Sequence, residues 1–345
     1  MVMQDGMVIG PYRIAGTLGK GGMATVYRGY HERLDRYVAV KVMHPTFLSD
    51  DNFRSRFQRE ARIVARLEHP NIVQVYDYNE HDNQPYLVMK FVDGMTLKKY
   101  ALKKGVTLTR TSKMLTELAG AMDYAHEKGI LHRDMKPSNI IIENDTGRPY
   151  ITDFGLARIA QVGASTLSHD MMLGTPYYIS PEQAQGLGDL DKRTDIYSFA
   201  VILYELITGS VPFMADTPYA IVHGHIYKEP QPPGERNDDL PVAVDDVLLK
   251  ALSKAPSDRY NSATELMQAF NAALLGAGVP DKSLSEPVET MSVPIHVEKL
   301  PSTQPPVRRD KQGKKVEVES SFDMGNVEWG DLGRRFESGV KNFAS

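Results

Sequence analysis

Cysteine is absent from the 345 residues of the sequence. This absence excludes disulfide bonds, thiolate catalysis and zinc or iron–sulfur sites built on cysteine. No run of about 18 uninterrupted apolar residues occurs, so a typical membrane-spanning helix is not expected. The first residues also lack a basic patch followed by a long apolar stretch, and we therefore expect a cytoplasmic protein without a secretory signal.

A strong charge of either sign is absent as well, because the net charge is only −4. A general nucleic-acid-binding protein would be basic, so that class is not expected. With 41% hydrophobic and 24% charged residues, the composition is that of an ordinary globular protein. The length suffices for one large two-lobed domain, or for two domains, with a sizeable core.

The hydrophobic pattern divides the chain into three regions. In residues 12–91, β-branched and aromatic residues predict five strands. The runs are YRIAGTL, ATVYRGY, RYVAVKVM, IVQVYDYN and PYLVMKFV. One helix is predicted among them, over residues 51–68. Residues 96–275 show apolar spacings of three and four, which predict helices. Residues 276–345 form a tail with six prolines between 280 and 306, which we expect to be mostly disordered.

A glycine-rich segment, LGKGGMATVY, joins the first two predicted strands. Gly19, Gly21 and Gly22 carry no Cβ, so the backbone can approach a ligand closely and present N–H groups to phosphate. Glycine-rich hairpin turns without a ligand share this pattern. The segment alone therefore does not decide the function.

Lys41 ends the run VAVK, where a charged side chain among Val and Ala is costly to bury without an anion. The predicted helix supplies one, because Glu60 falls on the face formed by Phe57, Val64 and Leu67. An ion pair between Lys41 and Glu60 satisfies both groups. Two alternatives remain: Lys41 extends into solvent, or Glu60 pairs with arginines of its own helix.

Two further segments carry oxygen ligands: HRDMKPSN over residues 132–139 and ITDFGLAR over residues 151–158. Asp134, Asn139 and Asp153 offer carboxylate and amide oxygens, and the glycine after DF lets the backbone swing. No pair of histidines stands at zinc spacing. Hard oxygen ligands of this kind favour Mg²⁺ bridged by phosphates.

The segments GKGGMATV, VAVK, Glu60, HRDMKPSN, DFG and SPE occur in an order and spacing that resemble those of protein kinases, specifically the bacterial eukaryotic-like Ser/Thr protein kinases. The resemblance covers residues 11–275. It implies an α+β, two-lobed fold: a β-rich N-lobe with one helix over about 11–91 and a mainly helical C-lobe over about 92–275. It also implies transfer of the γ-phosphoryl group of ATP to Ser and Thr hydroxyls of proteins.

The resemblance assigns roles to four of the charged or polar motif residues in nucleotide binding. Lys41 would hold the α- and β-phosphates of ATP, while Glu60 would hold Lys41. Asn139 and Asp153 would bind Mg²⁺, or Mn²⁺ in its place. Each of these implied roles agrees with the chemistry of the side chain concerned.

The resemblance also implies how the acceptor is handled. Asp134 would accept the proton of the substrate hydroxyl, and Lys136, placed as in Ser/Thr-specific members, would neutralise charge on the transferring phosphoryl group. Thr175, in GTPYYISPE, would lie near Asp134 in a peptide-docking platform, which small-molecule kinases of related fold lack. The alternative is a pseudokinase acting as a binding or scaffold module. It would lack at least one catalytic charge, and none is missing.

The nucleotide pocket is implied in the same way. Met89 would guard the back of the pocket, and the backbone groups of Lys90 and Val92 would pair with adenine. Lys90 stands where the family usually has an acidic residue, which would change contacts on the ribose side or with inhibitors. The other implied ATP contacts are Leu18, Gly19, Lys20, Gly21, Gly22, Val26, Ala39 and Ile141.

Three charged residues are implied to brace the C-lobe. Asp195, in DIYSFAVILYELITG, would anchor the backbone of the catalytic loop, and Glu182 would form a buried ion pair with Arg259. Two further positions depart from the family pattern: Ala24 replaces the third glycine of the phosphate loop, and Ser180 gives SPE in place of APE. Neither departure removes a charged group needed for transfer.

Arg133 and Arg158 would face the segment QVGASTLSHDMML, which contains three hydroxyl residues. These are Ser165, Thr166 and Ser168. A phosphate adds about −1.5 to −2 charge and would pair with both guanidinium groups. We therefore expect autophosphorylation at one or more of these residues, with Thr166 and Ser168 favoured, and a homodimer would allow it.

Aromatic residues recur every seven positions near the end of the tail, at Phe322, Trp329, Phe336 and Phe343. Glycines interrupt this stretch, so we expect residues 328–343 to form a helix only when docked. A basic cluster precedes it, made of Arg308, Arg309, Lys311, Lys314 and Lys315. The docking site would be the kinase domain, a partner groove or an anionic membrane surface, and the alternative is a disordered tail with accidental aromatic register.

Overall fold

The computed structural model describes residues 3–45, 51–154 and 176–276. Several predicted features lie outside these ranges: Thr175, Arg158, Ser165, Thr166, Ser168, the basic cluster of the tail and its conditional helix at 328–343. Within the described ranges, no helix combines the length and the apolar character that a bilayer span requires.

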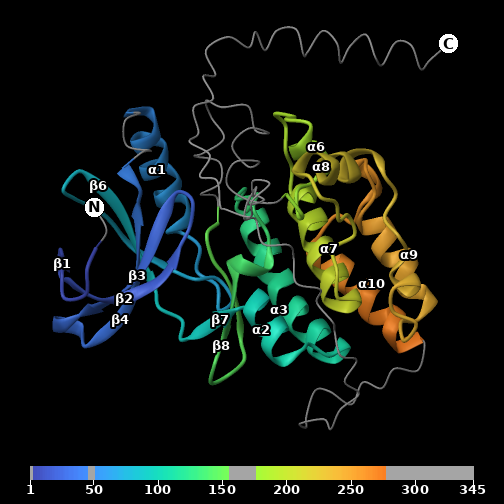
Figure 1. The fold of residues 1–345 in the computed structure, drawn as a ribbon, viewed down its shortest axis with the longest axis horizontal. Helices are drawn as coiled ribbons and strands as arrows, with labels where there is room; N and C mark the ends of the chain where they lie inside the picture. Colours follow the sequence, from blue (N-terminus) through green and yellow to red (C-terminus); the bar gives the residue numbers. More distant parts are fainter. Residues whose placement is uncertain (1–2, 46–50, 155–175, 277–345) are drawn as a thin grey trace, which may run out of the picture. The chain divides into compact units, whose positions relative to one another are not determined.

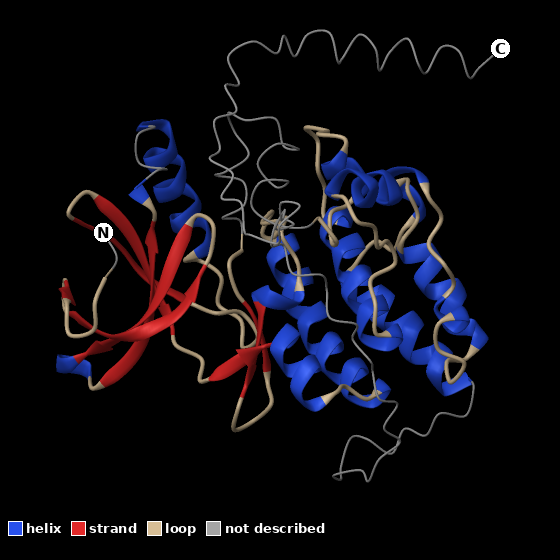
Figure 2. Ribbon diagram, viewed as in Figure 1, coloured by secondary structure: helices blue, strands red, loops and turns tan. Residues whose placement is uncertain are grey.

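The N-lobe is built on a six-stranded antiparallel sheet with the strand order β1-β2-β3-β4-β6-β5 (Figures 1 and 2). The strands are β1 (Val8–Ile9), β2 (Tyr12–Lys20), β3 (Ala24–His31), β4 (Arg36–Met43), β5 (Val75–His81) and β6 (Gln84–Lys90). All five predicted strands are confirmed, and the short β1 adds a sixth.

The two faces of this sheet have different roles. Because side chains alternate along a strand, β4 sends Val40 and Val42 to one face and Ala39 and Lys41 to the other. The valine face belongs to a buried core cluster: Met3, Ile9, Tyr12, Ile14, Tyr27, Val38, Val40, Val42, Tyr86 and Val88. This core includes residues that precede the expected domain start at 11. The opposite face carries Lys41.

Helix α1 (Asp51–Val64) packs beside β5 (Figure 1). Its buried residues include Phe57, Ala61 and Val64, and the ring centroid of Phe57 lies 5.8 Å from that of Tyr78. The helix is predicted to reach residue 68, but after Ala65 the N–H groups of Arg66 and Leu67 donate to carbonyls only three residues back. Leu67 is therefore buried from a turn rather than from the helix.

The C-lobe is mainly helical (Figure 2). Its helices are α2 (Leu97–Lys104), α3 (Leu108–Glu127), α6 (Pro181–Ala184), α7 (Arg193–Thr208), α8 (Pro218–Tyr227), α9 (Val242–Ala251) and α10 (Ala263–Gly276). Every residue of α7 from 194 to 207 is buried, which agrees with apolar residues on all of its sides. This central helix makes direct contacts with α3 and α9.

A small sheet of β7 (Gly94–Thr96), β8 (Ile140–Glu143) and β9 (Pro149–Ile151) connects the lobes, in the order β7-β8-β9. The N–H of Ile151 donates to the carbonyl of Asn71, and the N–H of Val73 donates to the carbonyl of Ile151, each at 2.8 Å. The catalytic loop (residues 132–139) therefore lies between α3 and β8, and Asp153 follows β9 closely. The expected two-lobed α+β architecture is confirmed.

Candidate active site

The catalytic loop brings Asp134, Lys136 and Asn139 together. Lys136 Nζ lies 2.9 Å from Asp134 Oδ1 and 2.7 Å from Oδ2. Asn139 Nδ2 donates to the main-chain oxygen of Asp134 at 2.8 Å and to its Oδ2 at 3.1 Å. The Asp134 and Lys136 side chains are 43% and 37% exposed, so a substrate can reach both. The turn η3 (Pro137–Asn139) begins at proline, whose fixed φ suits the first position of such a turn.

Asp195, in the first turn of α7, anchors this loop as expected. Its two carboxylate oxygens accept the backbone N–H groups of His132 and Arg133, both at 2.7 Å, and Oδ2 also lies 2.8 Å from His126 Nε2. These bonds hold Arg133 at a φ of 65°, which is strained for a residue other than glycine. Burial raises the pKa of Asp195, but its hydrogen bonds outweigh burial and hold this pKa below its ordinary value.

The partners of His132 define its tautomer. Its Nε2 lies 2.9 Å from the carbonyl oxygen of Thr152, which can only accept, so Nε2 carries the hydrogen. Its Nδ1 accepts the backbone N–H of Asp134 at 3.2 Å. The ring also packs edge-on against Phe154, with centroids 4.9 Å apart. The imidazole thus connects the catalytic loop with the segment that carries Asp153.

The second part of the site is an ion pair between Lys41 on β4 and Asp153 after β9, with Nζ and Oδ1 2.8 Å apart. Their side chains are only 14% and 27% exposed. Burial raises the pKa of Asp153, but the charge and hydrogen bond of Lys41 outweigh it and hold the pKa below its ordinary value. The charge of Lys136 acts on the Asp153 carboxylate in the same direction. The two parts of the site therefore share one electrostatic environment.

The structure corrects the expected ion pair between Lys41 and Glu60. Lys41 pairs with Asp153, and a pair between Lys41 and Glu60 is not formed in this structure. Glu60 is half-buried and flanks the buried stripe of α1, in which Ala61 takes the central position. Successive residues of a helix differ in direction by about 100°. This difference puts the carboxylate at the edge of the face that packs on the sheet.

The face of the N-lobe sheet that carries Lys41 also carries the expected adenine contacts. The strand register pairs Val26 with Lys41 and Ala39 with Met89, so these four side chains share one face. The remaining expected contacts differ in exposure: Val92 is buried, Ile141 on β8 is half-buried, and Leu18 near the end of β2 is 44% exposed. The predicted adenine wall is therefore assembled from β3, β4 and β6.

The side chain of Lys90 lies away from this wall. It alternates with Met89 along β6, and its Nζ lies 3.1 Å from Tyr150 Oη and 4.4 Å from the centroid of the Tyr150 ring. The N–H of Lys90 donates to the carbonyl of Gln74 at 2.9 Å. The expected change on the ribose side is not supported, and the backbone of Lys90 is the part that can contact the nucleotide.

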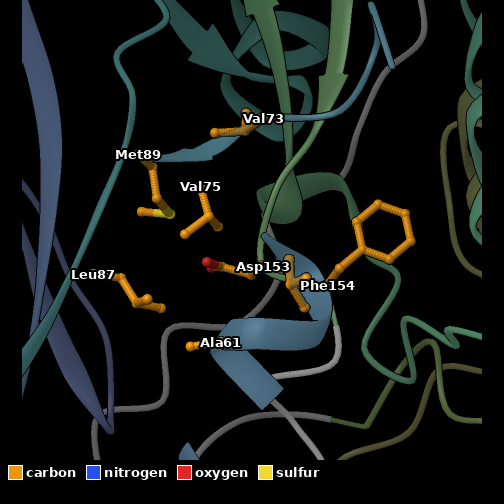
Figure 3. A pocket seen from close by; sticks show the side chains of 8 residues that line it. Ala61, Val73, Val75, Leu87, Met89, Asp153 and Phe154 are labelled. Atoms are coloured by element: carbon orange, nitrogen blue, oxygen red, sulfur yellow. The ribbon is translucent and has the colours of Figure 1, made fainter. Parts of the chain in front are cut away.

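A small apolar pocket lies beside Met89 (Figure 3). Its lining is Ala61, Val64, Val73, Val75, Leu87, Met89, Asp153 and Phe154. Figure 3 shows the Asp153 carboxylate pointing toward Val75 and Leu87, and the ring of Phe154 turned away from this space. Met89 belongs both to this pocket and to the adenine face, which agrees with its expected position at the back of the nucleotide pocket.

The phosphate loop (residues 18–25) is the tip of the β2–β3 hairpin. The N–H of Gly21 donates to the carbonyl of Ala24 at 2.9 Å and closes the turn. Gly21 and Gly22 are exposed, so their backbone is accessible to a ligand, whereas Ala24 is buried. The structure therefore accommodates the methyl group of Ala24 at the third glycine position. Glycine occupies positions 21 and 22, where the backbone is exposed. Gly19 and Lys20 pair with Val26 and Thr25 on β3.

Ser180 caps the N-terminus of α6, and this role explains why serine stands here in place of the alanine of the family pattern APE. Its Oγ accepts the N–H of Gln183, and Gln183 Oε1 accepts the N–H of Ser180, each at 3.3 Å. Gln183 Nε2 also donates to the carbonyl of Arg133 at 2.8 Å. Gln183 was not predicted as a site residue, although the spacing S-x-x-Q signals a capping box. It joins α6 to the catalytic loop.

The expected buried ion pair of Glu182 and Arg259 is confirmed. Both terminal nitrogens of Arg259 donate to the Glu182 carboxylate at 2.8 Å, and Thr194 Oγ1 adds a bond at 2.7 Å. Arg259 is 2% exposed and Glu182 is 5% exposed. Burial raises the pKa of Glu182, but the bonds from Arg259 outweigh burial and hold this pKa below its ordinary value. The other N–H groups of Arg259 reach main-chain oxygens of Arg193, Ser253 and Lys254.

The oxygens near Asp134 suit a hard divalent cation. Asn139 uses its nitrogen for both bonds to Asp134, which leaves its Oδ1 available, and Lys41 pairs with Oδ1 of Asp153. In the part of the chain that the structure describes, no three His, Asp or Glu side chains form a group able to hold a metal. A cation held by two protein oxygens completes its shell with phosphate and water, as Mg²⁺ prefers. Asn139 and Asp153 fit this type of site.

Comparison with known proteins identifies the family. The model of the protein kinase domain matches residues 12–270. The chain is 41% identical over 261 residues to the serine/threonine-protein kinase PknB of Mycobacterium tuberculosis, covering 74% of this chain and 41% of PknB. It is 40% identical to PknB of Mycolicibacterium smegmatis, with the same coverage of 74% and 41%. The crystal structure of the Mycobacterium tuberculosis PknI kinase domain matches with a TM-score of 0.64 at 31% identity, covering 79% of this chain and 100% of that one.

This chain therefore belongs to the protein kinase family. Members of the family use ATP and a divalent cation to phosphorylate proteins. The chain spans about two fifths of the length of the curated relatives that it matches.

Proposed function

We propose that this chain is an active Ser/Thr protein kinase that transfers the γ-phosphoryl group of Mg-ATP to protein hydroxyls. The observation that carries this proposal is the shared electrostatic site of Asp134 with Lys136 and of Asp153 with Lys41. The name of PknB as a serine/threonine-protein kinase supports the same reaction. A pseudokinase is disfavoured because Asn139 and the other catalytic groups are all present.

The transfer step uses Asp134 as the base and the ammonium group of Lys136 as the cation. Asp134 takes the proton of the acceptor hydroxyl while the hydroxyl oxygen bonds to the γ-phosphorus. The bond between the γ-phosphorus and the oxygen that bridges it to the β-phosphorus breaks, and ADP is released. Lys136 already contacts the Asp134 carboxylate, so its ammonium can follow the negative charge onto the transferring group. Because Lys136 stands two residues after Asp134, the arrangement matches that of Ser/Thr-specific members.

The nucleotide is held mainly from the N-lobe. The adenine ring binds beside Met89, Ala39 and Val26, with the backbone of Lys90 and Val92 as hydrogen-bonding groups. The phosphates lie under the phosphate loop. Asn139 and Asp153 would hold Mg²⁺, which would neutralise phosphate charge.

The observed Lys41–Asp153 pair implies an exchange of partners during the reaction. Phosphoryl transfer requires the strand lysine to pair with the helix glutamate and the aspartate to face the metal. Lys41 therefore leaves Asp153 and contacts the phosphates and Glu60. Glu60 is already half-buried at the edge of the packed face of α1, so a rotation of that helix brings it toward Lys41.

Lys41→Met tests the nucleotide part of this proposal. The variant loses the cation that holds the phosphates, and phosphorylation of a generic protein acceptor is expected to fall by about 10²- to 10³-fold. Steady-state rates with Mg-ATP measure the effect. Lys113→Met, at an exposed position on α3, serves as the matched control and is expected to keep the wild-type rate. A wild-type rate in Lys41→Met would contradict the assignment.

Autophosphorylation is the second part of the proposal, and it rests on the sequence outside the described residues. We expect a phosphate on one or more of Ser165, Thr166 and Ser168, where Arg133 and Arg158 can neutralise it. Transfer between two copies of the chain requires at least a transient homodimer. Mass spectrometry of the ATP-treated active protein tests this expectation. An active protein that stays unmodified across residues 160–175 would refute it.

A further inference from the structure

His44, the residue directly after β4, is attached to the phosphate loop by three hydrogen bonds. Its backbone N–H donates to the carbonyl of Met23 at 2.8 Å. Its ring Nδ1 lies 3.0 Å from the carbonyl oxygen of Gly22, and its Nε2 lies 3.0 Å from Thr25 Oγ1. Two of the three contacts are made by the imidazole. The tip of the hairpin is therefore tied to the next strand by a side chain as well as by the backbone.

The partners of the ring again define its tautomer. A carbonyl oxygen can only accept, so Nδ1 of His44 carries a hydrogen and donates it to Gly22. The Nε2 atom of the neutral ring then accepts the hydroxyl hydrogen of Thr25. The ring thus bridges one donor and one acceptor of the phosphate loop, and neither phenylalanine nor alanine at this position can do so.

His44 holds the loop from the side opposite to Lys41. Side chains alternate along β4, so His44, three residues after Lys41, follows the direction of Val42. Thr25 is paired with Val42 in the register of β3 and β4, and both are buried. Val42 belongs to the core cluster of the N-lobe. The contact of His44 with Thr25 therefore lies on the core side of the sheet, and Lys41 lies on the opposite side.

This placement orients the backbone of the loop. In a trans peptide the N–H points opposite to the carbonyl. The Gly22 carbonyl points to His44, so the N–H of Met23 points away from His44. A backbone N–H held in this direction is available to a phosphate oxygen.

We propose that His44 is a positioning residue for the phosphates of ATP: it fixes the Gly22–Met23 peptide so that the N–H of Met23 faces the bound phosphates. The inference rests on the proposed function, since it assumes ATP beneath the loop. Loss of the His44 imidazole should weaken binding of the phosphates but not of adenine, because the adenine contacts near Ala39 and Met89 lie on other parts of the sheet. Loss of the imidazole leaves the glycine-rich tip free to adopt other conformations.

The test compares affinities for Mg-ATP and for adenosine by calorimetry on the full chain. His44→Phe keeps an aromatic ring but loses both side-chain bonds, and it is expected to weaken Mg-ATP binding by about five- to tenfold. Adenosine binding is expected to stay at the wild-type value. Adenosine therefore reports that the pocket is still folded, whereas a general structural defect would weaken both ligands.

Two further variants separate positioning from packing. His44→Asn retains an N–H donor near the position of Nδ1, and it is expected to bind Mg-ATP more tightly than His44→Phe. Thr25→Val removes only the hydroxyl partner at similar volume and is expected to weaken Mg-ATP binding by about two- to fivefold. His81→Ala, which removes an imidazole at the end of β5, is the matched control and should leave both affinities unchanged.

The outcomes distinguish this inference from the proposed function. If wild type binds Mg-ATP more tightly than adenosine and His44→Phe keeps the same ratio of affinities, the positioning role is refuted while the proposed function stands. If wild type itself binds Mg-ATP no more tightly than adenosine, the proposed phosphate site is refuted, and the role of His44 is refuted with it.

Discussion

Asp134→Asn is expected to lower kcat for protein phosphorylation by about 10²- to 10⁴-fold, the usual contribution of a general base. The amide has the same shape as the carboxylate, but it does not accept the proton of the acceptor hydroxyl. It also removes the anion that Lys136 contacts with its ammonium group at 2.7 to 2.9 Å. KM for ATP should change little, because Lys41 and the adenine wall belong to the N-lobe.

Asp145→Asn is the matched control for this substitution. Asp145 is exposed in the turn between β8 and β9, and its loss should leave kcat unchanged. Thermal unfolding of both variants checks that each remains folded. If Asp134→Asn kept the wild-type kcat in a folded protein, the assignment of Asp134 as the base would be wrong.

Arg259→Met is expected to lower the free energy of unfolding by about 3–5 kcal/mol, because it leaves a buried carboxylate without its cation. Glu182 loses both bonds from Arg259 and keeps the one from Thr194. Urea unfolding measures the change, with Arg148→Met as a control at an exposed arginine. The double variant Glu182→Leu, Arg259→Met removes both charges and should recover part of the loss. A loss below about 1 kcal/mol in Arg259→Met would show that the pair is screened by solvent.

This stabilisation depends on pH in a defined direction. The pKa of Glu182 is lower in the folded state than its ordinary value, so the unfolded state binds the proton more readily. The contribution of the pair is therefore fully present above the unfolded pKa of about 4.3, and it is lost as the pH falls through the folded pKa. The difference between wild type and Arg259→Met should shrink on acidification below about pH 4.

Much of the fold and of the candidate site could be predicted because strand periodicity and motif spacing are local signals. Alternation along the run RYVAVKVM already puts Lys41 on the face opposite to Val40 and Val42, and the structure confirms it. The roles of Asp195 and of the Glu182–Arg259 pair could be predicted from their positions relative to the kinase motifs. The structure shows the expected hydrogen bonds at both places. These residues lie inside regular elements or are bound by the backbone next to them.

The partner of Lys41 could not be predicted from spacing. Phe57, Val64 and Leu67 define a helical stripe that passes between residues 60 and 61, and the sequence alone does not decide which of them is central. The structure puts Ala61 in the stripe and gives Lys41 to Asp153. Asp153 is far from Lys41 in the sequence, so no local sequence pattern predicts the ion pair between them.

Side-chain contacts to the backbone of remote loops were missed for a related reason. Gln183 donates to the carbonyl of Arg133, and His44 contacts the carbonyl of Gly22. Such bonds follow no period, because any polar side chain that the fold brings near a carbonyl can make them. Only the structure shows them, and both join a catalytic or phosphate-binding loop to a regular element.

The most direct test of the account is the identity of the phosphorylated product. The full chain is incubated with Mg-ATP labelled at the γ-position and casein as a generic acceptor, and the labelled protein is hydrolysed to its amino acids. Phosphoserine and phosphothreonine are predicted with wild type and should be reduced about 10²-fold or more with Asp134→Asn. Label found only on tyrosine, or no label above that of Asp134→Asn, would contradict the account.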